Sequence, residues 1–419
     1  MKSMFVSLLI LMMTSIPTLP LQDPAPEALS LEDCIQQAVT RNPLIQSSYQ
    51  QHQAALARVS QAKALAQPSV NWDSDLQPKL FDFKGTGEWY FGVSQELEFP
   101  GKRGLRGRIA GREADEIMQD IELLKLDVVF QVKQAFFSLL LSQEKLAYAE
   151  RNLELSRNYQ NQAELKFEAG DVARVEVLRA KVETSKAANQ VRASQSEVRL
   201  AKAYLNYLMA RKKYAPLTIQ GELDQKVTIL DLETLKQRAM SFRPEITRIQ
   251  HSLDRERLQK KSASMSYLPD FEIGVNRHKV LGEGSWWDVT LSFPIPLFFW
   301  QPARGEIAEA AANIRVLQKE TEHLENTIGL EVEEAFTNAQ GALNQIRLYE
   351  DEILTQAEEV YNMFQFSYQE GEIGGIELIE ARRTLIEART SYADALFNYR
   401  TAIADLEKSI GQTLEGELP

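Results

Sequence analysis

The sequence predicts a membrane protein of mixed helix and strand, built from two tandem repeats with four short strands and unusually long helices. First, an alternating, strand-like run ends at Phe99 and leads into a proline-free helical pattern from about Gly104 to Phe167. At about 1.5 Å per residue this helix would be roughly 90–100 Å long, whereas globular helices usually have about three or four turns. Second, the same succession of a strand-like run and a long helical pattern recurs later in the chain. Third, no run of about 18 apolar residues follows the N-terminal region, so membrane insertion must use strands.

An internal duplication defines the domain organisation. Residues in the first half recur 201 positions later, and Gly170 and Gly371 keep the same offset. We expect a signal peptide at 1–22, repeats at 30–215 and 231–411, a linker at 216–230 and a C-terminal tail at 412–419. The matching pairs at the start of the repeats are Leu31 with Leu232, Glu32 with Glu233, Ala38 with Ala239, Pro43 with Pro244, Ile45 with Ile246 and Pro68 with Pro269.

Each repeat is expected to hold four helices and one strand pair. A short helix (31–41; 232–242) stops before a proline, and a helix of about 23 residues (44–66; 245–265) follows. Long helices (about 104–167 and 303–368) end at glycine and lead into return helices (172–212 and 373–411). Seven-residue spacing in the long helices predicts supercoiled packing. The spaced residues are Val132, Leu139, Leu146, Leu153 and Phe167, and then Val332, Ala339, Ile346, Ile353 and Val360.

The strands show period-two alternation, which is typical of a half-buried sheet or a barrel wall. Apolar residues occupy one face of each strand and polar residues the other. Tryptophans near the strand ends fit the aromatic belt of a membrane barrel, with a soluble sheet core as the alternative. The expected apolar face comprises Val70, Trp72, Leu76, Trp89, Phe91, Val93, Leu97, Phe99, Phe271, Ile273, Val275, Trp287, Val289, Leu291 and Phe293, and Trp286 is the fourth belt tryptophan.

Four strands cannot close a barrel. An open edge in lipid would leave backbone groups unpaired at a cost of several kcal/mol each. The chain therefore requires either oligomerisation or a location outside the membrane. Three copies would supply 12 strands and 12 helical columns, but the need for closure does not by itself select three.

Composition narrows the possible partners. The net charge of −12 argues against nucleic acid and against an anionic bilayer surface. Lys2 and the apolar run from Met4 to Met13 resemble an export signal that is too short to span a bilayer. The single cysteine, Cys34, is interpreted as a small apolar helix residue, with a reactive thiol as the alternative.

The duplicated plan, the opening Ser30-Leu-Glu-Asp with Asn42-Pro43, and the paired Phe-x-x-Gly and Tyr-x-x-Gly turns resemble the outer-membrane channel family typified by TolC. The run Gln95-Glu-Leu-Glu-Phe-Pro-Gly-Lys-Arg-Gly104 and the segment Glu168 to Val172 are similar to its CzcC-like heavy-metal branch. This resemblance implies a homotrimer with a 12-stranded barrel in outer-membrane lipid and a helical tunnel in the periplasm. It also implies a periplasmic adaptor (membrane fusion protein) and an inner-membrane RND pump as partners, and no catalysis.

The resemblance also suggests functional residues at the turns after the long helices. The turns would form the periplasmic opening and meet the adaptor, although glycine there is also an ordinary helix end. A gate would lie nearby, with carboxylates that repel one another and attract cations; solvated helix carboxylates are the alternative. The tip residues are Gly170, Asp171, Val172, Gly371, Glu372 and Ile373, and the gate residues are Glu176, Tyr368, Glu377 and Glu380. The family's basic residue after the second glycine is replaced by Ile373, so Arg382 or Arg383 would have to substitute in a closing ion pair.

The segment Pro100-Gly101-Lys102-Arg103 is expected to form the seam between barrel and tunnel, with both basic residues at the periplasmic headgroup level. No catalytic, cofactor-binding or metal-binding residues are predicted, because His52, His251, His278 and His323 are scattered and cysteine does not cluster. The leading interpretation is a passive trimeric duct for heavy-metal efflux. A duct for multidrug efflux or type I protein secretion and, from another class, a periplasmic coiled-coil adaptor remain as alternatives.

Overall fold

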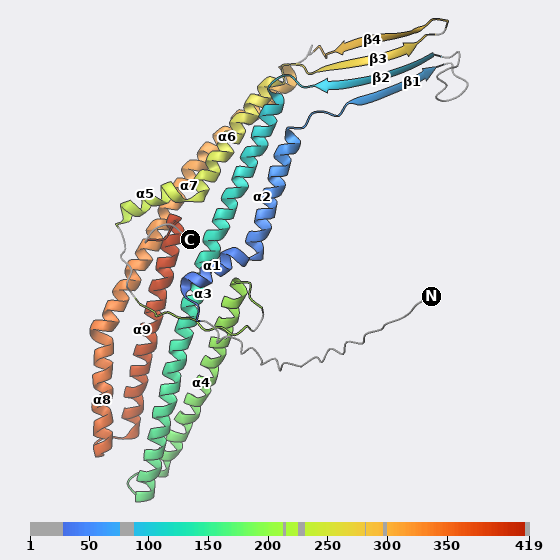
Figure 1. Ribbon diagram of the computed structural model, residues 1–419. Coiled ribbons are helices and arrows are strands. Elements are labelled where there is room, and N and C mark those ends of the chain that lie inside the picture. The colour runs from blue at the N-terminus through green and yellow to red at the C-terminus, as the bar shows by residue number, and fades with distance from the viewer. Residues whose placement is uncertain are drawn as a thin grey trace, which may run out of the picture.

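The computed structural model describes residues 28–75, 88–212, 215–224, 231–280, 282–295 and 300–414. The predicted signal peptide at 1–22 and Leu76 lie outside these ranges. The chain forms an elongated wall, with the strands at one end and two helical hairpin turns at the other (Figure 1).

In the first repeat, caps and prolines set the short helices. Ser30 and Asp33 form a reciprocal capping box at the start of α1, and the side chain of Asn42 accepts a hydrogen bond from the backbone amide of Leu44. The second helix ends at Ala62, four residues before the expected end at Ala66. The elements are α1 (Leu31–Arg41), α2 (Pro43–Ala62), β1 (Ser69–Asp75), β2 (Glu88–Leu97), α3 (Lys102–Ala169) and α4 (Arg174–Leu208).

The second repeat has the same element order with one difference. Its long helix is interrupted by a π turn at Tyr349–Ile353, where an uninterrupted helix was expected. A π turn accommodates one extra residue in the helical ladder, and hydrophobic spacing alone does not reveal it. The elements are α5 (Leu232–Phe242), α6 (Pro244–Met265), β3 (Phe271–Lys279), β4 (Ser285–Ser292), α7 (Trp300–Leu348), α8 (Leu354–Glu370) and α9 (Gly375–Ile410).

All four strands form one antiparallel sheet in the order β1-β2-β3-β4. The two hairpins are joined because β2 of the first repeat pairs with β3 of the second, with Val93 opposite Val275. The register places the expected apolar residues that lie within the described strands on one side of the sheet, while Phe99 and Phe293 lie just beyond the paired residues. Trp286 differs, because it lies opposite His278 on the polar face and therefore does not join the other three tryptophans.

The helices form two rows that share α3, and α7 also spans both because it packs against α6 and α9. Beside the strands the order of packed neighbours is α2, α3, α6 and α7, and towards the hairpin turns it is α4, α3, α9 and α8. The two shorter helices of the first repeat, α2 and α4, thus lie along successive parts of the same long helix (Figure 1). This arrangement matches the expected stacking of two shorter helices beside each long one.

The heptad positions pack as predicted only in the middle of the long helices. Val132, Leu139 and Ile346 are fully buried, but Phe167 and Val360 near the hairpin turns are exposed. An α-helix drifts relative to a strict seven-residue repeat, so the buried stripe moves to other residues along so long a helix. Near the turns the buried positions are Tyr159, Ala163, Ala180, Tyr368 and Leu378.

Candidate functional site

The two hairpin turns lie at the same end of the molecule (Figure 1). Gly170 and Gly371 end α3 and α8 with φ of 86° and 80°, in the left-handed region that favours glycine. The amide of Asp171 donates to the carbonyl of Lys166 at 2.8 Å, and that of Glu372 donates to the carbonyl of Ser367 at 2.9 Å. The turns are therefore built alike and present an acidic residue each to solvent.

Just above the turns, a tyrosine joins three helices. The hydroxyl of Tyr159 on α3 donates a 2.6 Å hydrogen bond to Glu176 on α4, and its ring lies 5.6 Å from the ring of Tyr368 on α8. Burial raises the pKa of Tyr159, and the hydrogen bond to the Glu176 carboxylate raises it further. The phenol therefore stays protonated and acts as a donor.

Gly375 on α9 completes this arrangement. A Cβ atom at this position would collide with the Glu176 carboxylate and the Tyr159 hydroxyl, so α9 can approach them this closely with any other residue only if these side chains shift. Lys166 adds a second link, since its ammonium donates to the carbonyl of Tyr368 at 2.9 Å and lies 4.4 Å from that ring. We call Tyr159, Lys166, Glu176, Tyr368 and Gly375 the tip cluster.

The tip cluster brings together only two of the four predicted gate residues. Glu176 and Tyr368 belong to it, whereas Glu377 and Glu380 are exposed on α9. Arg383 lies 3.8 Å from Glu380 on its own helix. Arg382 is buried, its pKa is lowered by burial, and in the part of the chain described here it forms no ion pair. Neither arginine thus closes an ion pair between the two hairpins within one chain.

Sequence reasoning missed Tyr159, Lys166 and Gly375. The adjacent pair Gly374-Gly375 at the start of a helical pattern was a usable signal, because glycine is unfavourable inside a helix unless something approaches closely. The Tyr368 hydroxyl is buried without a hydrogen-bond partner among the described residues. Leaving such a group unpaired costs about 1–3 kcal/mol.

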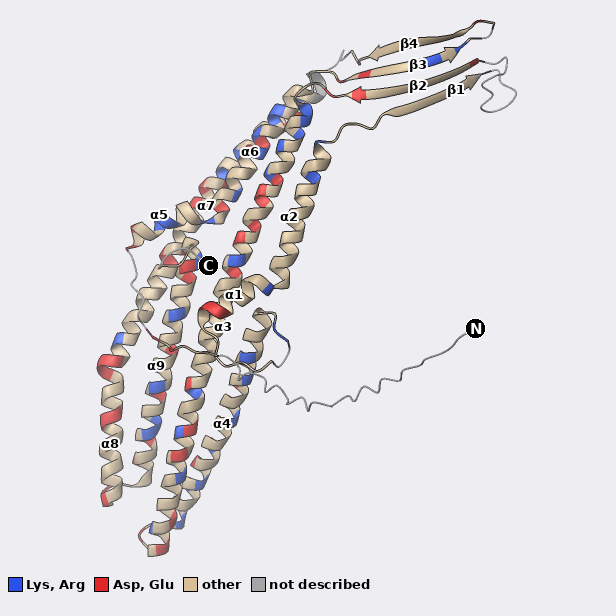
Figure 2. Cartoon of the chain, in the orientation of Figure 1, with Lys and Arg blue, Asp and Glu red and all other residues tan. Residues whose placement is uncertain are grey.

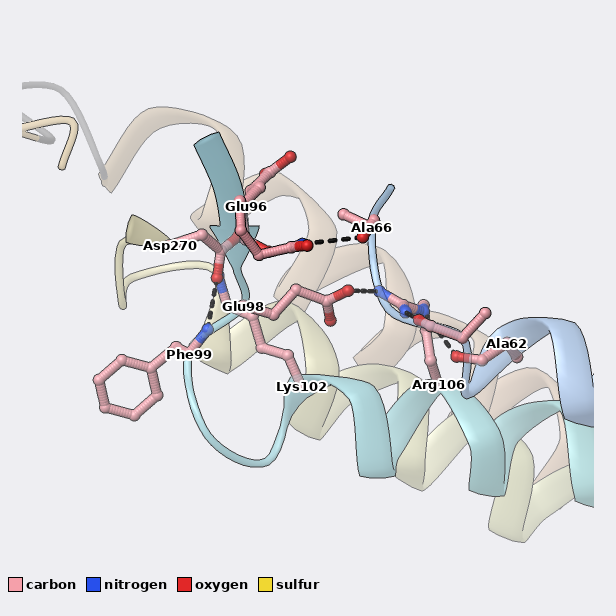
Figure 3. Close-up of polar contacts among 10 residues, drawn as sticks. Ala62, Ala66, Glu96, Glu98, Phe99, Lys102, Arg106 and Asp270 are labelled. Atoms are coloured by element: carbon pink, nitrogen blue, oxygen red, sulfur yellow. Dashed lines mark hydrogen bonds and ion pairs between the residues drawn. The ribbon is translucent and has the colours of Figure 1, made fainter. Parts of the chain in front are cut away.

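The seam between strands and helices joins the two repeats (Figure 3). Gly101 takes a left-handed φ of 103° between β2 and α3. The ammonium of Lys102 donates to the carbonyl of Leu268 at 2.7 Å and pairs with Asp270 at 2.9 Å. Asp270 also accepts the backbone amide of Phe99 at 2.7 Å, so one carboxylate holds both sides of the turn.

On the other side of the seam, Arg106 connects the segment after β2 with the end of α2. Its guanidinium pairs with Glu98 at 2.6 Å and donates to the carbonyls of Ala62 and Ala64 at 3.0 and 3.4 Å (Figure 3). It therefore caps the end of α2, where carbonyls have no partner within the helix. The ammonium of Lys102 is engaged by protein oxygens of the second repeat, and the expected place of Lys102 at the headgroup level stays a prediction. Arg103 is exposed, and its place at the headgroup level stays a prediction.

The cysteine and the histidines, the other residues considered for reactivity or metal binding, have ordinary surroundings. Cys34 is fully buried and burial raises its pKa to about 12, so its thiol behaves as an apolar packing residue. Within the described ranges no group of three metal-ligating side chains occurs, and His278 pairs with Asp288 alone at 3.1 Å.

Two segments of the chain, residues 34–211 and 235–412, match the family described as outer membrane efflux protein. The chain belongs to the outer membrane efflux protein family. Members of this family are passive outer-membrane channels and not enzymes. Among the described helices, none combines the length and the apolar character needed to cross a membrane.

Two relatives are similar to this efflux protein over most of its length. The cobalt-zinc-cadmium resistance protein CzcC of Cupriavidus metallidurans is 21% identical over 320 residues, which is 75% of each chain. Nodulation protein T of Rhizobium leguminosarum bv. trifolii is 22% identical over 403 residues, covering 91% of this chain and 85% of that one.

Solved structures show the same fold. The channel CusC matches with a TM-score of 0.76 at 18% identity, covering 91% of this chain and 92% of that chain. The outer-membrane channel OprN matches at 0.73 and 17%, covering 91% and 89%. The CmeC outer membrane channel of Campylobacter jejuni also matches at 0.73 and 17%, covering 91% and 85%.

Proposed function

We propose that this protein is the outer-membrane duct of a tripartite efflux system, that it works as a homotrimer, and that its cargo is heavy-metal cations. The observation that carries the channel proposal is that, among the described elements, the wall has two free edges at every level. These edges are β1 and β4 in the sheet, α2 and α7 beside the strands, and α4 and α8 towards the turns. Three copies would close 12 strands into a barrel and continue it as a helical tunnel.

The edge helices carry the apolar surface that closure needs. Large apolar side chains on α4 and α8 are exposed in the single chain, where they would be unfavourable in water. Packing of α4 of one copy against α8 of the next would bury them and pair the two helical edges. These side chains are Val175, Leu178, Val182 and Leu200 on α4, and Val360, Met363 and Phe366 on α8.

The charge on the polar face of the sheet favours a cationic cargo. With the apolar face towards lipid, this face would line the barrel. Its described strand residues include several carboxylates and no lysine or arginine, so it would attract cations and repel anions. The carboxylates are Asp73, Glu88, Glu96, Glu272 and Asp288. The likeness to a cobalt-zinc-cadmium resistance protein supports the same cargo.

We place the periplasmic gate at the tip cluster and its neighbours. The cluster ties α8 and α9 to α3 and α4, and Glu377 and Glu380 would form carboxylate rings near the opening of the trimer. The adaptor would contact the two turns at Gly170-Asp171-Val172 and Gly371-Glu372-Ile373, and an inner-membrane RND pump would supply the energy. Release of the tip cluster would let the second hairpin move away and widen the opening.

A deletion strain tests the cargo. Cells that lack the protein should become sensitive to zinc, cobalt, cadmium or copper, and a plasmid copy should restore tolerance. Sensitivity to dyes alone would instead support the multidrug duct, and loss of an exported protein alone would support type I secretion. Membrane fractionation tests the class, because extraction by salt alone would support the periplasmic adaptor.

A further inference from the structure

Charged residues are segregated between the two faces of the sheet. The apolar face carries two cations, Arg277 and Lys279, and no carboxylate among its described strand residues. Both lie on β3 at the end remote from the helices, where Figure 2 shows basic residues on that strand. The chain as a whole is acidic, so this basic site stands out from its surroundings.

Aromatic rings surround the two cations. Arg277 lies opposite Phe91 on one neighbouring strand and Trp287 on the other, and its guanidinium is 5.4 Å from the Trp287 ring. Lys279 lies opposite Trp89, which stacks on Trp72 at 5.9 Å. Arg277 is exposed and, within the described part of the chain, forms no ion pair.

We propose that Arg277 and Lys279 bind the phosphate groups of a phosphorylated lipid in the membrane leaflet around the outer end of the barrel. This site rests on the proposed function, since it requires the apolar face to meet lipid. Tryptophan and tyrosine belong at the headgroup level of a bilayer, and basic side chains there pair with phosphate. Guanidinium is well suited to phosphate because it donates several hydrogen bonds in a fixed plane.

The surroundings favour a lipid over a soluble anion. Below the two cations, towards the helices, the same face continues as a row of exposed apolar side chains at Val275, Val289 and Leu291. A lipid would bring acyl chains to these residues and phosphate to the cations at once. A free phosphate ion would leave the apolar row exposed to water.

The test uses the purified full-length protein in detergent micelles. Bisphosphorylated lipid A and its dephosphorylated form are added, and bound lipid is measured by native mass spectrometry. The variant R277Q/K279Q removes both charges, and the matched control R257Q/K319Q removes two exposed charges from the helices. Two cations near an anionic lipid surface contribute about 1 kcal/mol each, so R277Q/K279Q should bind phosphorylated lipid A about 30-fold more weakly.

The wild type and the control should bind phosphorylated lipid A alike and should discriminate against the dephosphorylated form. R277K/K279R keeps the charges and should retain most of the binding. Equal binding by R277Q/K279Q and the wild type would overturn the proposal, as would complete displacement of the lipid by millimolar pyrophosphate, which would mark a site for soluble anions. If R277Q/K279Q restores metal tolerance in cells and still binds lipid normally, only the lipid-site proposal is contradicted. If the wild-type protein is absent from the outer membrane, the proposed function itself is contradicted.

Discussion

The hydroxyl of Tyr159 donates a 2.6 Å hydrogen bond to Glu176, and these two groups occupy the space that a side chain at Gly375 would need. This relationship fixes how closely α9 approaches the first hairpin. Helix α9 carries Glu377 and Glu380, so the same contact also sets the position of the proposed carboxylate rings. Three helices thus meet at a point where one added methyl group would force the Tyr159 and Glu176 side chains, or α9 itself, to shift.

Gly375→Ala should therefore open the proposed gate. Overpacking of this kind costs about 1–3 kcal/mol, and moving α9 away from Tyr159 and Glu176 is the direct way to relieve it. We expect a higher single-channel conductance in planar bilayers than for the wild type. Gly374→Ala is the matched control, because its Cβ would meet only the flexible end of Glu377. Wild-type conductance in Gly375→Ala would show that this contact does not limit the opening.

The two tyrosines of the tip cluster should respond differently to loss of the hydroxyl. Tyr159→Phe removes the donor to Glu176 and should raise the conductance. Tyr368→Phe removes a hydroxyl that has no partner within the described chain, so the closed state should be unchanged or slightly more stable. An increased conductance in Tyr368→Phe would instead show that this hydroxyl gains a partner in the trimer.

Glu377→Ala together with Glu380→Ala should weaken cation block and cation selectivity. Three copies of two carboxylates in a narrow opening attract cations, and their removal abolishes that field. Reversal potentials in a salt gradient and block by a divalent cation would measure the change. Glu359→Ala with Glu387→Ala is the charge-matched control on the same hairpin, since both residues are exposed. Unchanged selectivity in the first variant would remove these residues from the gate.

The seam ion pair makes a pH-dependent prediction. Partial burial acts to raise the pKa of Asp270, but the Phe99 amide and the Lys102 ammonium outweigh it and lower the pKa. A carboxylate with a lowered pKa stabilises the fold above its unfolded pKa of about 3.9, and this contribution is lost as the pH falls through the folded value. Asp270→Asn should lower the Tm at pH 7, and the difference from the wild type should shrink at acid pH.

Lys102→Met is the companion variant at the seam. It removes the same ion pair, so adding it to Asp270→Asn should lower the Tm by less than the sum of the single effects. Fully additive effects, or a difference that persists at low pH, would argue against the pair as the source of stability.

The sequence predicted the repeats of helix and strand because period, proline and glycine report local structure directly. The alternation of β2 and β3 predicts that Val93 and Val275 lie on the apolar face, where the two residues pair. The same local signals could not reveal Tyr159 as a partner of Gly375, because these residues are far apart in the chain and meet only through tertiary packing. The π turn at Tyr349–Ile353 was missed for a related reason, since its extra residue changes the ladder without changing the apolar pattern.

At the seam, likewise, the sequence could not predict which charged residues form ion pairs. The sequence predicts one position for the adjacent basic residues Lys102 and Arg103, yet the structure turns Lys102 towards Asp270 of the other repeat and leaves Arg103 exposed. Neighbouring side chains on a helix point about 100° apart, so their partners are set by what lies beside each face. Sequence proximity therefore carried little information about which of the two cations is available to a ligand.

Cys34 should resist thiol reagents in the native protein. Its side chain is fully buried in the packing between α1 and α3, and burial raises its pKa to about 12. The thiolate is the reactive form, and the raised pKa keeps the thiol protonated at pH 8. We expect no maleimide labelling of the native protein over an hour and one label per chain after denaturation, with Cys34→Ala as the unlabelled control. Stoichiometric labelling without denaturant would mean that α1 opens readily from α3, and the thiol would then have to be considered reactive.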